Sequence, residues 1–258
     1  MKPRPSFPAR LDSTGSRSPG ARRSSAASTS PRIASSQGPG ATSFDAARRS
    51  MVGKLATLGL QDLNVRHAME TVERHRFVDT ALQGQAYEET SLPIGLGQTI
   101  SKPGVVARML ELLRNGRDGR LGRVLEVGTG CGYQAAVLSL LAHEVYSIER
   151  LRGLHDKARD NLRMLRVANL HLLFGDGMAG FPKGAPYAGI IAAAAGGGAI
   201  PTAWTDQLAV GGRLVAPVSV GTGAVASQAL VVIDKSTHGL QQTVFEAVHF
   251  VPLKSGVA

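Results

Sequence analysis

From residue 121 to residue 218 the chain alternates short apolar runs with stretches whose apolar residues recur at helical spacing. Apolar runs that predict strands lie at residues 124–127, 145–149, 170–174, 187–194 and 212–218. The helical pattern occupies the intervals at residues 135–141, 151–165 and 200–208. Strands that alternate with helices in this way predict a doubly wound α/β fold around a mostly parallel sheet.

The two flanking regions predict additions to this sheet. Before it, amphipathic helices are expected at residues 44–58, 63–69 and 105–113. Asp62 is the expected N-cap of the second of these helices. After the sheet, the runs 228–234 and 243–251 have no helical pattern between them, so we expect antiparallel strands at the sheet edge that bring the total to seven. The stretch 87–103 has too many glycines and prolines for a regular element, and we expect an ordered functional loop there.

Charge and composition separate an N-terminal tail from the remaining chain. The first 50 residues carry nine Lys or Arg against two Asp, which is +7 of the formal net charge of +10. Residues 1–42 are rich in Ser, Arg and Pro, and we expect them to be disordered. A solvated extension, an over-extended start site, a nucleic-acid arm and a transit peptide remain open as explanations. The remaining chain is close to neutral, so nucleic-acid binding is not expected of it.

Other compositional features exclude several classes of protein. The longest apolar run is shorter than the roughly 18 residues that span a bilayer, so a soluble protein is expected. One cysteine and seven scattered histidines offer neither a disulfide framework nor metal-ligand spacing. We therefore expect no metal, no membrane association and a cytoplasmic, reducing location.

The segment 124–134, Val-Leu-Glu-Val-Gly-Thr-Gly-Cys-Gly-Tyr-Gln, carries the strongest candidate chemistry. A buried strand runs through three alternating glycines into a helix, which leaves backbone N–H groups and the helix N-terminus free to bind a nucleotide-like group. A dinucleotide site has the spacing G-x-G-x-x-G, which the sequence does not match, whereas Glu149 at the end of the next strand suits the ribose of either cofactor type. Glu126 begins the pattern E-x-G-x-G-x-G, which resembles the first motif of methyltransferases that use S-adenosylmethionine.

Further motifs narrow the resemblance to one family. They are 92–95 (Leu-Pro-Ile-Gly), 97–101 (Gly-Gln-Thr-Ile-Ser), 146–149 (Tyr-Ser-Ile-Glu), 175–177 (Gly-Asp-Gly), 211–215 (Gly-Gly-Arg-Leu-Val) and 250–253 (Phe-Val-Pro-Leu). In order and spacing the chain from Met51 to Leu253 resembles the protein-L-isoaspartate O-methyltransferases. This resemblance implies a Rossmann-like, seven-stranded methyltransferase domain over residues 43–258. Its parts are a helical cap with the substrate loop (43–120), a cofactor-binding core (121–218) and the C-terminal strands (219–258).

The resemblance also implies an activity and a set of site residues. The methyl group of S-adenosylmethionine passes to the α-carboxylate of an L-isoaspartyl residue, and the ester closes to a succinimide that reopens partly as aspartate. Cofactor contacts are implied for Glu126, Gly128, Thr129, Gly130, Gly132, Glu149, Asp176 and Gly177. Glu126 either orders the glycine loop or lies near the methionine end. Substrate contacts are implied for Thr99, Ile100 and Val251. The partners are isoaspartyl peptides and proteins, and the enzyme is expected to be a monomer.

Ser101 aligns with the active-site serine of that family. A carboxylate is already nucleophilic at neutral pH, so catalysis needs proximity and a neutral orienting hydroxyl rather than a strong base. The simpler alternative is that Ser101 only caps the helix that follows. Cys131 stands where serine is common in the family. Two interpretations remain open: a thiol whose pKa the helix N-terminus lowers, or simply a small loop residue.

Two other functions remain open on the sequence alone. One is a methyltransferase that acts on a small-molecule acid or an RNA. The other is a cofactor-binding protein without catalysis, which would keep the glycine motif but would not require Ser101.

Overall fold

A computed structural model describes residues 39–220 and 227–258. The expectation of a disordered tail falls on residues outside this range, except at 39–42, which belong to the first helix. That helix therefore begins before the expected start at residue 44. Within the described ranges no helix has the length and apolar character needed to cross a membrane.

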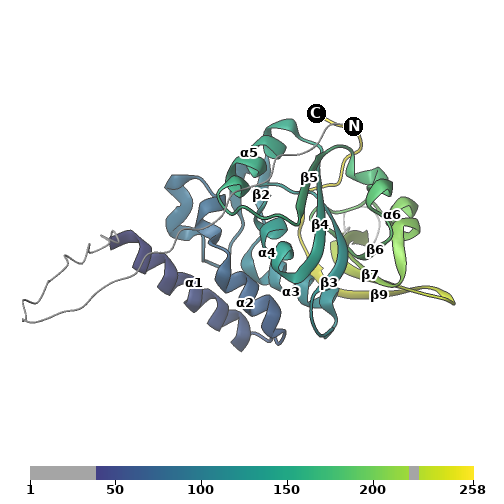
Figure 1. Cartoon of the computed structure of the whole chain (residues 1–258), viewed down its shortest axis with the longest axis horizontal. Helices are drawn as coiled ribbons and strands as arrows, with labels where there is room; N and C mark the ends of the chain where they lie inside the picture. The colour runs from purple at the N-terminus through teal and green to yellow at the C-terminus, as the bar shows by residue number, and fades with distance from the viewer. Residues whose placement is uncertain (1–38, 221–226) are drawn as a thin grey trace, which may run out of the picture. The chain divides into compact units, whose positions relative to one another are not determined.

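Parallel pairing around β3 organises the main sheet (Figure 1). Its strand order is β5-β4-β3-β6-β7-β8-β9, with the last two joined antiparallel. The strands are β3 (Leu121–Val127), β4 (Ala142–Glu149), β5 (Leu170–Phe174), β6 (Tyr187–Ala192), β7 (Leu208–Val220), β8 (Ser227–Ser236) and β9 (Gly239–Val248). The predicted doubly wound sheet with antiparallel edge strands is confirmed.

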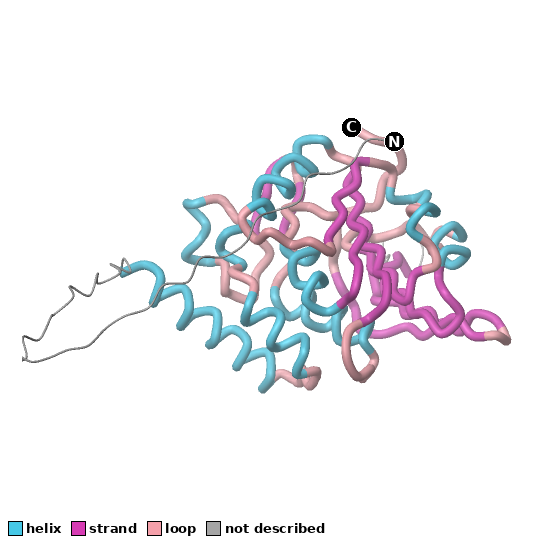
Figure 2. The backbone as a smooth tube through the Cα atoms, in the orientation of Figure 1, coloured by secondary structure: helices cyan, strands magenta, loops and turns pink. Residues whose placement is uncertain are grey.

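Helices cover both faces of the sheet. They are α1 (Pro39–Thr57), α2 (Leu63–Thr71), α3 (Pro103–Arg114), α4 (Tyr133–Leu141), α5 (Arg152–Arg163) and α6 (Thr202–Gln207). Because successive strand residues point to opposite faces, Val124 packs in the core shared with α1–α5, whereas Leu125 packs in the core that contains Trp204 of α6. Figure 2 shows the helices of the N-terminal half gathered beside the strands.

The N-terminal helices are tied to the domain by Asp62. Its carboxylate caps α2 by accepting hydrogen bonds from the backbone N–H groups of Asn64 and Val65, which confirms the predicted N-cap. The second carboxylate oxygen accepts from Arg114 Nε at 2.7 Å, and both side chains are almost fully buried. This ion pair joins the start of α2 to the end of α3.

The expectation of an irregular loop before α3 is wrong for residues 92–100. They form a hairpin of β1 (Leu92–Gly95) and β2 (Gln98–Ile100), with Leu92 paired to Ile100. Gly95, Leu96 and Gly97 make the turn at positive φ, so the glycines serve the turn and leave the flanking residues extended. Four 3-10 segments in the described ranges complete the list: η1 (Arg74–Phe77), η2 (Thr80–Gln85), η3 (Gly177–Ala179) and η4 (Pro182–Gly184).

The topology creates a crevice at the carboxyl end of β3. From β3 the chain crosses to β4 on one side, while β6 is the neighbour on the other side. Ligands of open α/β sheets bind at such a switch point. The glycine segment lies directly after β3, and the fold therefore positions it at this crevice.

Candidate active site

The glycine segment between β3 and α4 has a backbone that only glycine adopts readily. Gly128, Gly130 and Gly132 have φ values of 92°, 58° and 91°. A Cβ on Gly132 would also lie 2.9 Å from Leu162 Cδ1. This backbone conformation therefore favours glycine at all three positions, and α4 begins immediately after the third.

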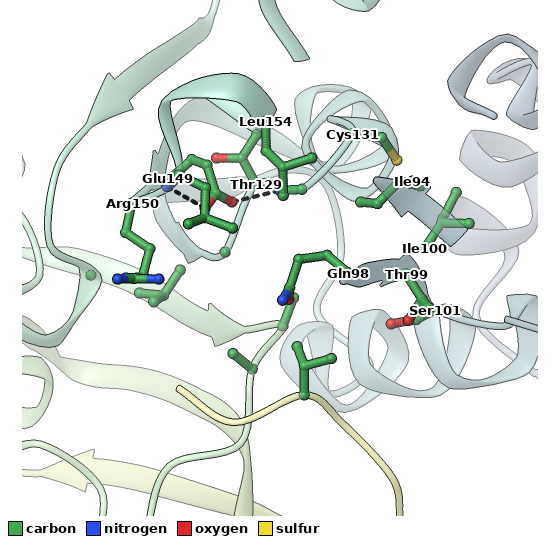
Figure 3. A pocket seen from close by; sticks show the side chains of 18 of the residues that line it. Ile94, Gln98, Thr99, Ile100, Ser101, Thr129, Cys131, Glu149, Arg150 and Leu154 are labelled. Atoms are coloured by element: carbon green, nitrogen blue, oxygen red, sulfur yellow. Dashed lines mark hydrogen bonds between the residues drawn. The ribbon is translucent and has the colours of Figure 1, made fainter. Parts of the chain in front are cut away.

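A cavity of about 400 Å³ opens beside this glycine turn, within the size range of ligand pockets. Segments that are distant in sequence line it, among them the β1–β2 hairpin with Ser101, the glycine turn, the end of β4 and the residues after β9. Figure 3 shows Gln98 and Ser101 on one side of the cavity and Thr129 and Glu149 on the other. All three predicted substrate residues and most of the predicted cofactor residues thus line one space, from which Glu126, Gly132 and Asp176 are set back.

Glu149, predicted to hold a ribose, lies at the cavity wall and is 5% exposed. Its carboxylate accepts hydrogen bonds from the backbone N–H of Gly130 at 2.9 Å and of Leu151 at 3.0 Å. Each oxygen retains a further lone pair that can accept from a ligand hydroxyl. Glu149 therefore supports the glycine turn as well as facing the cavity.

Glu126, predicted among the cofactor residues, does not line the cavity. It is fully buried below the turn, where its Oε2 accepts a hydrogen bond from the Ser147 hydroxyl. The Thr129 hydroxyl lies 2.6 Å from Ser147 Oγ. Either hydroxyl of this pair can be the donor. Burial raises the pKa of Glu126 to about 8, against the opposing effect of the Ser147 hydrogen bond. The Glu126 carboxyl is thus linked to the glycine turn through the hydroxyls of Ser147 and Thr129.

Asp176 is also set back from the cavity, although Gly177 lines it. The Asp176 carboxylate caps η3 through the backbone N–H of Met178 at 2.8 Å. Its other oxygen accepts from the N–H of Gly256 at 2.7 Å, which ties the segment after β9 to this end of the site. A close approach explains the glycine at 177, since a Cβ there would lie 2.5 Å from Val127 Cγ1.

The substrate side is formed by the residues that follow β1. Thr99, Ile100 and Ser101 all line the cavity, and Val251 lines it from the segment after β9. The Ser101 side chain points into the open space (Figure 3). The alternative that Ser101 caps α3 is wrong, because Lys102 occupies the N-cap position. In the first turn the backbone N–H of Gly104 donates to the Glu89 carboxylate at 2.9 Å, not to Ser101.

The environment of Cys131 decides between the two interpretations of this residue. Its side chain is 3% exposed, and burial raises the pKa of the thiol above its ordinary value, an effect that outweighs the neighbouring backbone N–H groups. The idea that the helix N-terminus lowers this pKa is therefore wrong. Desolvation penalises the thiolate more than the helix end stabilises it.

Arg74 and Tyr133 were missed as site residues by the sequence reasoning. Arg74 lies in the run Arg-His-Arg, which has the appearance of a solvated surface segment, yet its side chain is fully buried. Tyr133 lines the cavity as the first residue of α4. The sequence offers one indication for Tyr133, since it directly follows the last glycine of the motif. Only the tertiary structure reveals the burial of the arginine.

Comparison with known proteins assigns the chain to a family. The family model described as protein-L-isoaspartate(D-aspartate) O-methyltransferase matches residues 46–258. A protein-L-isoaspartate O-methyltransferase of Methylibium petroleiphilum is 52% identical over 99% of this chain and 98% of its own. One from Leptothrix cholodnii is 58% identical over 83% of this chain and 75% of its own. The chain belongs to the protein-L-isoaspartate(D-aspartate) O-methyltransferase family.

Solved structures agree with this family membership. A structure titled protein-L-isoaspartate O-methyltransferase superposes with a TM-score of 0.72 at 26% identity, over 81% of this chain and 67% of that chain. A putative family member from Plasmodium falciparum has the same fold, with a TM-score of 0.68 at 23% identity over 80% of this chain and 98% of that chain. That structure contains S-adenosyl-L-homocysteine.

The residues of this chain fit an S-adenosylmethionine site of the kind the family uses. The glycine turn has positive φ at Gly128 and Gly130, and both residues line the cavity, so a ligand there can approach the backbone closely. Glu149 presents carboxylate oxygens at the cavity wall, suited to ribose hydroxyls. Among the described residues no cluster of His, Cys, Asp and Glu is arranged to hold a metal ion.

Proposed function

We propose that this protein transfers the methyl group of S-adenosylmethionine to the α-carboxylate of L-isoaspartyl residues in damaged proteins, in the cytoplasm. The observation that carries the proposal is the meeting of Ser101 with the glycine turn around one cavity. Family membership indicates the reaction, and the geometry supports it because candidate cofactor and substrate residues line the same cavity.

The cofactor side is assigned to the glycine turn and Glu149. Gly128, Gly130 and Gly132 bring the backbone close to the methionine and ribose portions, and Glu149 accepts hydrogen bonds from the ribose hydroxyls. Thr129 lines the cavity and is held by Ser147 over Glu126. Gly177 forms part of the adenine end, where Asp176 holds η3 and the segment around Gly256 in place.

The reaction places few demands on the protein. When bound, S-adenosylmethionine supplies an electrophilic methyl group next to a cationic sulfur. The substrate carboxylate is ionised at neutral pH and needs no base to activate it. What the chain must provide is alignment of the carboxylate oxygen with the methyl carbon and exclusion of competing water.

Ser101 is proposed as the residue that orients the substrate carboxylate. Methyl transfer cancels opposite charges, so a strong counter-charge on the carboxylate would stabilise the ground state more than the transition state. A neutral hydroxyl donates one hydrogen bond and leaves the other oxygen free to attack. Thr99, Ile100 and Val251 form the walls against which the substrate backbone lies, and extended backbone pairing there would tolerate many sequences.

Paired peptides provide the test of this function. The protein is incubated with S-adenosylmethionine labelled in the methyl group and with peptides that differ only in Asp versus L-isoAsp. We expect base-labile label on the isoaspartyl peptide alone, because the product is a methyl ester. Equal labelling of both peptides, or labelling of an RNA or a small acid instead, would overturn the proposal.

A further inference from the structure

Arg74 carries a fully buried guanidinium. It is the first residue of η1, and its side chain is 0% exposed. Among the described residues no ion pair joins it to a carboxylate. Its Nη1 has no hydrogen-bond partner in that part of the chain. An unpaired guanidinium in the interior carries a large desolvation cost, so its contacts need a physical explanation.

These contacts connect three segments around the site. Arg74 Nε donates to the carbonyl oxygen of Ala86 at 2.7 Å, and Nη2 donates to the carbonyl oxygen of Ser101 at 2.7 Å. The guanidinium carbon lies 4.8 Å from the centre of the Tyr133 ring. The planar, forked guanidinium is the side chain suited to bridge two carbonyls while it stacks on an aromatic face.

Two of these neighbours, Ser101 and Tyr133, line the cavity. Ser101 lines the substrate side, and Tyr133 follows Gly132 at the end of the glycine turn. Arg74 itself does not line the cavity, so it acts on the site only through these neighbours. A carboxylate and a methyl group must be aligned within a fraction of an ångström, and displacement by about 1 Å can cost about 100-fold in rate.

We propose that Arg74 is a positioning residue for methyl transfer, whose guanidinium fixes Ser101 relative to the glycine turn by binding the Ser101 carbonyl and stacking on Tyr133. The inference rests on the proposed role of the Ser101 hydroxyl. It assigns Arg74 no contact with substrate or cofactor.

Arg74→Lys is the informative variant, and Arg114→Lys is its matched control. Lysine keeps the charge but cannot bridge both carbonyls in the arginine geometry. Arg114 is 1% exposed and bonded to Asp62 and two carbonyls, away from the cavity.

The measurements are the melting temperature, the Kd for S-adenosylmethionine, and kcat and KM with an isoaspartyl peptide. Arg74→Lys should lower kcat by about 10- to 100-fold with little change in cofactor Kd. Arg114→Lys should lower the melting temperature but leave kcat per folded molecule unchanged.

Equal kcat losses in the two lysine variants would overturn the inference, since burial of an arginine would then explain both. A loss in Arg74→Lys that disappears after correction for the folded fraction would also overturn it. If Arg74→Lys does not fold, Arg74→Gln provides the same comparison, because its neutral amide carries no buried charge and retains a donor. The Arg74→Gln variant should likewise lower kcat with cofactor Kd maintained, and unchanged kcat would reject the proposal.

A double-mutant cycle with Ser101→Ala separates this inference from the proposed function. If Arg74 acts through the Ser101 hydroxyl, Arg74→Lys should change kcat much less in the Ser101→Ala background than in the wild type. Full activity of Ser101→Ala would remove both the serine role and the positioning role. Impaired Ser101→Ala combined with a fully additive Arg74→Lys effect would remove the positioning role alone.

Discussion

The carboxylate of Glu149, at the end of β4, accepts a hydrogen bond from the backbone N–H of Gly130 in the glycine turn, at 2.9 Å. The same side chain lines the cavity from a position that is 5% exposed. One residue therefore supports the turn and presents an acceptor to a ligand. Replacement of Glu149 is therefore expected to weaken ligand binding more than it lowers the stability of the fold.

Glu149→Ala should weaken S-adenosylmethionine binding by about 10- to 100-fold, because a hydrogen bond to a charged group contributes about 1.5–3 kcal/mol. Isothermal titration calorimetry measures the change. Glu144→Ala is the control on the same strand, since Glu144 is a half-buried residue paired with Arg123 and lies outside the cavity. Equal affinities of Glu149→Ala and the wild type would refute the ribose role.

Ser101→Ala should lower kcat/KM for the isoaspartyl peptide by about 10- to 100-fold, since the variant loses one hydrogen bond to an ionised carboxylate. Its Kd for S-adenosylmethionine should stay the same, because Ser101 lies on the substrate side of the cavity. The control is Ser236→Ala, at the exposed β8–β9 turn. Turnover of Ser101→Ala at the wild-type rate would eliminate the orienting role.

Glu126 should make stability depend on pH. Burial raises the pKa of this carboxyl from 4.5 to about 8, so between these values the folded state binds a proton that the unfolded state has lost. The free energy of unfolding should therefore fall as pH rises across this window, by at most about 1.4 kcal/mol per unit, and level off above pH 8.

Glu126→Gln removes this titration while it keeps an acceptor for Ser147. Urea unfolding of both proteins at pH 5.5 and pH 8 measures the effect. We expect the stability of the variant relative to the wild type to increase with pH. A constant difference between the two proteins across this range would show that Glu126 is ionised throughout.

Cys131 should resist alkylation in the folded protein, because its thiol is buried and burial raises its pKa. Iodoacetamide at pH 8 should label the native protein slowly and the urea-unfolded protein rapidly, with mass spectrometry as the readout. Cys131→Ser is the control for labelling elsewhere. Fast labelling of the native protein that S-adenosylmethionine blocks would indicate an accessible thiol and contradict the buried position.

The sequence alone determined the parts of this protein that depend on local pattern. The alternation of apolar runs with helical spacing predicted the doubly wound sheet, and Asp62 predicted the start of α2. The glycine spacing predicted a turn with close backbone approach, and the positive φ values of Gly128 and Gly132 agree with it. Local sequence carries these features because backbone conformation and side-chain periodicity are properties of neighbouring residues.

The tertiary structure alone decided which charged groups are solvated and which are buried. Glu126 was predicted among the cofactor residues and lies beneath the cavity, burial raises the pKa of Cys131, which the sequence left open, and the burial of Arg74 was not predicted. A pKa and a buried contact depend on desolvation by segments that are distant in the chain. The carbonyl groups that hold Arg74 come from residues 12 and 27 positions away, a separation that no local pattern records.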